Sequence, residues 1–130
     1  MTVRARPLSP HLGYYRPRLG SVTSILHRIT GAILAVGLLA FAYWLIALAS
    51  DAAAYATAQS LFASPLGLIV LIGWTFAFFY HLLNGVRHLI WDSGRGFEPG
   101  ARRLGGWTAI GGSILLSLGF WASLRLLGRL

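Results

Sequence analysis

The stretch "YHLLNGVRHLIWDSG" (residues 80–94) directly follows the apolar run "PLGLIVLIGWTFAFF" (residues 65–79). Such a run is typical of a helix that crosses a lipid bilayer, which needs about 20 predominantly apolar residues. Ionisable side chains inside a membrane-spanning segment are costly and usually mark a function. The two histidines, the arginine and the aspartate that end this segment therefore indicate a functional site at membrane depth or at the membrane edge.

Composition places the chain among integral membrane proteins. Of its 130 residues, 56% are hydrophobic and only 11% are charged, far from the mixture of a soluble domain. We predict an all-α membrane protein in which residues 21–130 form a transmembrane anchor domain. Residues 1–20, rich in arginine and interrupted by prolines, are predicted to lie extended on the cytoplasmic surface. The three transmembrane helices are expected at about residues 21–49, 65–91 and 104–127.

The arginines lie beside the expected spans, so the net charge of +8 indicates membrane topology rather than nucleic acid binding. Five arginines lie up to the start of the first apolar stretch and four flank the second loop, whereas the first loop carries only Asp51. By the positive-inside rule, the N-terminus and the second loop face the cytoplasm or its mitochondrial equivalent. Arg125 and Arg129 oppose this assignment but are outnumbered.

Helical spacing places His81, Gly85 and His88 on one face, since successive residues turn by about 100°. Gly85 leaves space between the two rings, where a flat macrocycle could approach. His81 would lie deeper in the membrane and could coordinate haem iron, while His88, with Arg87 nearby, could meet the haem propionates. The alternative is that His81 bonds a neighbouring helix and that Arg87 and His88 simply end the span. The chain has no cysteine, which excludes a covalently attached c-type haem.

A second polar group opens the first span in "SVTSILHRITG" (residues 21–31). Ser24 and Arg28 share a helix face, with His27 one step round. A hydroxyl and a guanidinium at the membrane boundary could bind the carbonyl of a quinone and stabilise negative charge on its oxygen. Alternatively, Ser21 or Ser24 caps the helix and Arg28 reaches the lipid headgroups.

Three stretches, "RPLSPHLGYY" (residues 6–15), "SILHRITG" (residues 24–31) and "HLLNGVRHLIWDSG" (residues 81–94), resemble the cytochrome b-556 membrane-anchor subunit of succinate dehydrogenase, respiratory complex II. The resemblance covers almost the whole chain. It implies a haem b-binding anchor subunit of the bacterial inner membrane, with the mitochondrial inner membrane as the alternative. Such a subunit forms part of the ubiquinone-reduction site and passes electrons from succinate oxidation to quinone. It has no succinate-oxidising site of its own.

The resemblance also implies roles for individual residues. His81 matches the axial ligand of the haem iron. The residues matched to the haem propionates are His27, Arg28 and His88. The residues matched to the quinone region are Ser24, Ile25, Arg28 and Asp92.

Partner subunits are expected on two grounds. The resemblance implies a flavoprotein with FAD, an iron-sulfur protein and a second small membrane anchor. Independently, the other histidines of the chain belong near the cytoplasmic surface, so a second axial ligand at the depth of His81 should come from a partner subunit. We therefore expect the chain to be part of a heteromeric helical bundle.

A stripe of small residues in the third span could serve such a partner or pack within the chain's own bundle. The stripe consists of Ala109, Ser113 and Ser117.

Two other functions are compatible with the residues. A fumarate reductase anchor would use similar chemistry in the opposite direction, by oxidising a quinol. A small channel or transporter subunit would use His81 and Arg87 as a proton or ion relay.

Overall fold

The computed structural model describes residues 11–128, which form helices and connecting loops without any strand. Three helices are long and apolar enough to cross a membrane, namely α2, α4 and α5. The prediction of an all-α protein with three transmembrane helices is thus confirmed. The helices are α1 (His11–Tyr14), α2 (Leu19–Ser50), α3 (Ala52–Ala63), α4 (Pro65–Asp92) and α5 (Pro99–Leu126).

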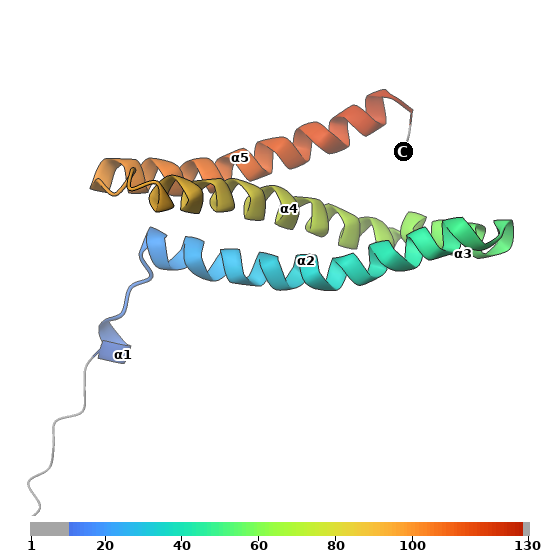
Figure 1. Cartoon of the computed structure of the whole chain (residues 1–130), viewed down its shortest axis with the longest axis horizontal. Coiled ribbons are helices and arrows are strands. Elements are labelled where there is room, and N and C mark those ends of the chain that lie inside the picture. Colours follow the sequence, from blue (N-terminus) through green and yellow to red (C-terminus); the bar gives the residue numbers. More distant parts are fainter. Residues whose placement is uncertain (1–10, 129–130) are drawn as a thin grey trace, which may run out of the picture.

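Successive long helices run in opposite directions, so that α4 is antiparallel to both α2 and α5 (Figure 1). The start of α2, the end of α4 and the start of α5 therefore lie at one end of the bundle, and α3 lies at the other. Helix α4 packs against both α2 and α5. Because α2 has 32 residues, it is about 48 Å long at ~1.5 Å per residue and exceeds the ~30 Å hydrocarbon core.

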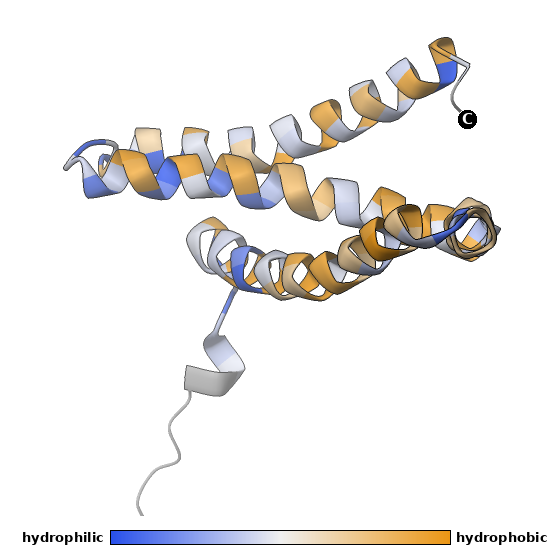
Figure 2. Ribbon diagram, turned by 45° about the vertical axis from the view of Figure 1, so that its right-hand side comes forward, coloured by the Kyte–Doolittle hydropathy of each residue, from blue (hydrophilic) through white to orange (hydrophobic). Residues whose placement is uncertain are grey.

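The segment that was expected only to join the first two spans forms the separate helix α3. The Asp51 carboxylate accepts a hydrogen bond from the Ala54 amide at 2.8 Å and caps the start of α3. Ser64 caps α4 in the same way, through the Gly67 amide at 3.0 Å, and Pro65 occupies the first position of α4, where its missing N–H costs nothing. Figure 2 shows α3 nearly end-on, so it runs at an angle to α2 and α4.

The turn between α4 and α5 is shorter than the sequence suggested, because α5 begins at Pro99. Gly94 and Gly96 have positive φ angles of 79° and 78°, a conformation that side chains with a Cβ rarely adopt. The Trp91 indole donates to the Gly96 carbonyl at 3.0 Å and holds the turn against α4. The turn lies at the same end of the bundle as the start of α2 (Figure 1), with one arginine in it and the other arginines of this region in the helices on either side.

The N-terminal segment is only partly described. Residues 1–10 of the expected extended segment lie outside the described residues. Residues 11–14 form the single turn α1, and α2 starts at Leu19, slightly before the predicted start of the first span.

Contacts between the long helices rely on small side chains. Ala109, Ser113 and Ser117 are 2%, 0% and 8% exposed, so the small-residue stripe of α5 packs inside the chain's own bundle and is not free for a partner. A Cβ on Gly112 would lie 2.8 Å from a methyl of Leu83, which shows how closely α5 approaches α4. Such close approach through small residues is characteristic of membrane helices.

The membrane topology can be tested with single cysteines, since the native chain has none. Thr57 in α3 and Ser93 after α4 are both exposed and lie at opposite ends of the bundle. With the N-terminus in the cytoplasm, Thr57→Cys should react with a membrane-impermeant thiol reagent from the outer side and Ser93→Cys from the cytoplasmic side. Labelling of Thr57→Cys only from the cytoplasmic side would reverse the topology.

Candidate functional site

Three histidine rings from two helices stack on one another near the arginine-rich end. His27 of α2 lies between the two histidines of α4: its ring centroid is 3.9 Å from that of His81 and 4.9 Å from that of His88. The ring planes deviate by 10° and 20° from parallel. We call His27, His81 and His88 the histidine stack. The structure thus brings together the three histidines that the resemblance associated with haem.

Hydrogen bonds define the tautomer of His81. Its Nδ1 lies 3.2 Å from the His27 carbonyl oxygen and 3.3 Å from the Thr30 hydroxyl. A carbonyl oxygen only accepts hydrogen bonds, so Nδ1 carries the proton and Nε2 keeps its lone pair. Within residues 11–128, no hydrogen bond engages Nε2. A metal-ligating histidine commonly bonds through its other ring nitrogen in this way.

The surroundings of His81 fit a haem held by axial ligation. A Cβ on Gly85 would meet nothing within 4 Å, so the surface of α4 is open at Gly85, although the His27 ring fills the space between the rings of His81 and His88. The His88 Nδ1 lies 2.7 Å from the Asn84 carbonyl, which fixes that ring as well. Among the described residues there is no group of three or more side chains suited to a bare metal ion. A single free imidazole nitrogen is enough for a macrocycle such as haem, because four ring nitrogens of the macrocycle already hold the metal.

His27 cannot complete such a site as the opposing ligand. Its ring lies nearly parallel to that of His81 at 3.9 Å, which leaves no room for a macrocycle between them. His88 follows His81 on the same face of α4 and therefore cannot approach iron from the opposite side. A metal centre held by His81 would therefore need a further ligand from outside the histidine stack.

The outward face of α2 carries the residues expected to bind quinone. Ile25 is 55% exposed, and Arg28 is exposed as well. The N-cap of α2 is Arg18, so neither Ser21 nor Ser24 has the capping role that the alternative interpretation gave them. The Ser24 hydroxyl has no hydrogen-bond partner among the described residues, whereas Thr23 donates to the carbonyl of Gly20. Ser24 is therefore free to bind a ligand.

Asp92 ends α4 at the same end of the bundle as the start of α2 (Figure 1). Its side chain is exposed, and within the part of the chain that the structure describes no ion pair involves it. Asp92 is thus available at the surface, although among the described residues no hydrogen bond or ion pair joins it to the histidine stack.

Arg87 turns away from His88 and into the bundle. Its guanidinium donates to the Thr23 hydroxyl at 3.1 Å and to the Asn84 amide oxygen at 3.2 Å. It also donates to the Arg102 carbonyl at 3.3 Å and lies 4.2 Å above the Trp91 ring. The side chain is only 8% exposed. Arg87 therefore joins α2, α4 and α5, a role different from the propionate contact considered from sequence.

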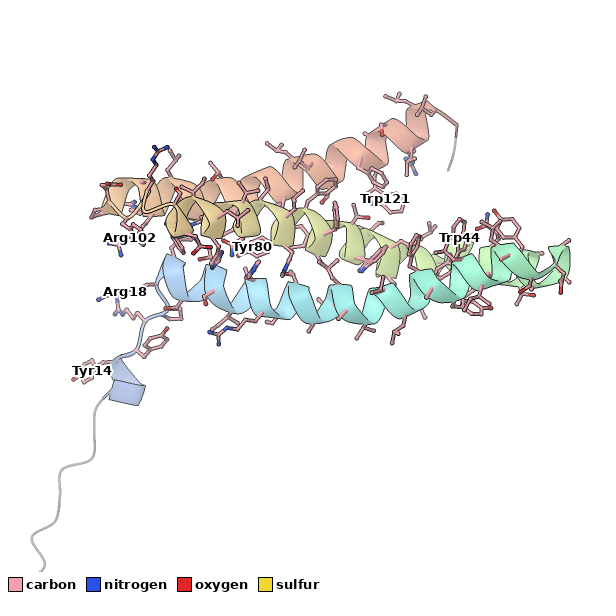
Figure 3. All side chains as sticks on the ribbon, viewed as in Figure 1. Tyr14, Arg18, Trp44, Tyr80, Arg102 and Trp121 are labelled. Carbon is pink, nitrogen blue, oxygen red and sulfur yellow. The ribbon has the colours of Figure 1, made fainter. Side chains whose placement is uncertain are left out.

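Tyr80 completes a group of interior polar residues, of which the sequence analysis singled out only Arg87. Its hydroxyl donates to the Thr23 carbonyl at 2.9 Å, and both Tyr80 and Asn84 are 0% exposed. Figure 3 shows Tyr80 between α4 and α2, near the end where Arg18 and Arg102 lie. The available signal was the recurrence of polar residues at positions 80, 84 and 87, one helical step from the histidines. We call Thr23, Tyr80, Asn84 and Arg87 the polar cluster.

The fold and the site together define a small integral membrane subunit of three transmembrane helices, with a histidine site near one end. Residues 2–120 match the family model described as the succinate dehydrogenase/fumarate reductase transmembrane subunit. The chain belongs to this family.

Individual relatives agree with this assignment. The chain is 42% identical to the succinate dehydrogenase cytochrome b556 subunit of Paracoccus denitrificans, over 87% of each chain. It is 40% identical to the subunit of that name from Rickettsia bellii, over 89% of this chain and 90% of the relative. It is 36% identical to the succinate dehydrogenase cytochrome b560 subunit of Reclinomonas americana, over 89% and 84%. The resemblance drawn from the sequence is confirmed.

The polar cluster predicts a stability effect at Thr23, which is 1% exposed. Thr23→Val keeps the shape of the side chain but removes the oxygen that accepts from Arg87. A buried donor left without its partner costs about 1–3 kcal/mol, so the melting temperature of the purified anchor should fall. Thr108→Val is the matched control, because Thr108 likewise donates to a carbonyl three residues earlier but is exposed. Equal melting temperatures for the two variants would contradict a supporting role for the cluster.

Proposed function

We propose that this chain is the haem b-binding membrane-anchor subunit of a succinate:quinone oxidoreductase, complex II. The relatives reported above are named as succinate dehydrogenase cytochrome b subunits and match most of the chain. The observation that carries the proposal is the histidine stack, in which His81 is bonded through Nδ1 and keeps Nε2 available. The chain would act as part of an enzyme whose succinate-oxidising site belongs to another subunit.

His81 would hold haem b through Nε2 as one axial ligand. The second ligand would come from the other small membrane-anchor subunit, because the histidine stack cannot supply it. His27, Arg28 and His88, which lie toward the arginine-rich end, would contact the haem propionates. When bound, the haem supplies a centre that takes up and returns one electron at a time.

Ser24 and Arg28 would bind ubiquinone at the cytoplasmic edge of the membrane. The free Ser24 hydroxyl would donate a hydrogen bond to a quinone carbonyl. Arg28 would stabilise the negative charge that develops on the quinone oxygen during reduction, because charge-assisted hydrogen bonds are stronger than neutral ones. Ile25 would line the same pocket, and Asp92 would provide an acidic group in this region.

The arginine-rich end would face the cytoplasm and receive the iron-sulfur subunit and the FAD-containing flavoprotein, which carry electrons from succinate. We place the chain in the bacterial cytoplasmic membrane, in keeping with the relatives from Paracoccus and Rickettsia. The family description covers fumarate reductases too, but the names of these relatives favour succinate oxidation. Membership of this family does not support a channel or transporter.

Haem binding can be tested by removing single imidazoles from the complex. His81→Ala should abolish or strongly reduce haem b, measured from the reduced-minus-oxidised absorption spectrum per mole of complex. His88→Ala removes the same chemical group from the same helix face but takes away only a propionate contact, so it should lower the haem content much less than His81→Ala does. A wild-type spectrum and full haem content in His81→Ala would remove His81 as the ligand.

The quinone site can be tested by comparing two activities. Ser24→Ala and Arg28→Leu should slow succinate-driven quinone reduction by about ten- to a hundredfold, since a hydrogen bond that involves a charged group is worth roughly 1.5–3 kcal/mol. Succinate oxidation with an artificial acceptor that takes electrons before the anchor should be unchanged. Ser21→Ala and Arg18→Leu are controls at exposed or half-buried positions earlier in the same chain, and should leave both activities unaltered.

Subunit content and haem must be equal in all these variants before rates are compared. A structural role for Ser24 or Arg28 predicts that both activities fall together with the amount of assembled complex. Fully assembled variants that reduce quinone at the wild-type rate would refute the quinone assignment.

A further inference from the structure

Thr30 is a buried hydroxyl in direct contact with the candidate iron ligand. It lies on α2 and is 4% exposed. Its Oγ1 is 3.3 Å from the Nδ1 of His81 on α4. The sequence distance between the two residues is 51 positions, so this contact exists only because α2 and α4 pack together.

The hydroxyl proton of Thr30 is engaged within its own helix. Oγ1 lies 2.8 Å from the Leu26 carbonyl and 3.0 Å from the His27 carbonyl. A threonine hydroxyl has one proton to donate and two lone pairs to accept with. Because the proton goes to a carbonyl of the preceding turn, a lone pair of Oγ1 is free to accept from the His81 Nδ1–H.

The Nδ1–H of His81 therefore has two acceptors, the Thr30 hydroxyl and the His27 carbonyl at 3.2 Å. Neither acceptor has a proton left to give to Nδ1. Both contacts favour the tautomer in which Nε2 is unprotonated and able to bind a metal.

Gly31 gives the imidazole the room to reach these acceptors. A Cβ at position 31 would lie 3.0 Å from the Cε1 of His81, closer than atoms normally approach. The ring is thus seated against the backbone of α2, with the parallel ring of His27 3.9 Å away.

We propose that Thr30 is a positioning residue for the haem site: it fixes the tautomer and orientation of His81 and raises the electron-donating strength of its Nε2. This inference rests on the proposed function, in which His81 ligates haem iron. Hydrogen bonds to the second ring nitrogen make a histidine ligand more basic. A more basic ligand favours ferric over ferrous iron and so lowers the midpoint potential of the haem.

Thr30→Val removes the hydroxyl with little change in shape and leaves the His27 carbonyl in place. Outer-shell partners of metal ligands typically contribute factors of about 10 to 100. Since one of two acceptors remains, we expect the preference for ferric iron to fall by up to about tenfold, which equals an upward shift of ~59 mV for a one-electron couple. The measurement is a spectroelectrochemical titration of haem b in the intact complex.

Two variants serve as controls. Thr30→Ser restores a hydroxyl at the same position and should return the potential to the wild-type value. Thr75→Val removes a matched hydroxyl, since Thr75 also donates to the carbonyl four residues earlier, at 2.7 Å, but has no hydrogen bond to a histidine among the described residues. It should leave the potential unchanged.

A purely structural role of Thr30 would lower the haem content or the melting temperature without moving the potential. If Thr30→Val does not assemble, Thr30→Cys provides the comparison with Thr30→Ser, because sulfur is a weaker acceptor than oxygen. A higher potential for the weaker acceptor supports the proposal. Equal potentials for Thr30→Val and Thr75→Val, or for Thr30→Cys and Thr30→Ser, would overturn it. Haem retained in His81→Ala would instead refute the ligand assignment itself.

Discussion

The arrangement of the three long helices depends on the buried guanidinium of Arg87. A membrane interior offers no water to its N–H groups, so protein oxygens must satisfy them. Its two terminal nitrogens donate to Thr23 on α2, Asn84 on α4 and the Arg102 carbonyl on α5, while its buried Nε has no partner among the described residues. Gly105 makes room on α5, because a Cβ there would lie 3.2 Å from the Arg87 Nε. One side chain thus requires three helices to meet at the end that carries the site.

This interior contact also sets the direction of the histidine face. The polar cluster occupies positions 80, 84 and 87 of α4, and the histidine face occupies positions 81, 85 and 88, rotated by about 100°. A rotation of α4 about its axis would break the bonds of Arg87 and of the Tyr80 hydroxyl at once. The polar cluster therefore fixes the rotation of α4 at which His81 faces the backbone of α2.

The outer surface of the helix bundle is suited to contact with lipid and with further helices. Large apolar side chains such as Leu39 and Leu115 are 72% and 71% exposed, whereas the buried apolar residues of the described chain are mostly alanines. Association of membrane helices relies on close packing of small residues, because lipid is as apolar as leucine. In this chain the small residues of α5 pack against the other helices of the same bundle. The stripe that contains Ser113 is therefore not the surface on which a partner would dock.

The sequence by itself determined the class and the approximate spans, since apolar length and arginine placement follow directly from the thickness and polarity of a bilayer. It also placed His81, Gly85 and His88 on one face, because helical periodicity is local. What it left open depended on contacts between helices. The packing of α2 on α4 decided that Arg87 points inward, that the histidines stack, and that Thr30 meets His81 across 51 positions of sequence. Helical spacing gives the face of a residue, but which neighbour that face meets follows only from the tertiary fold.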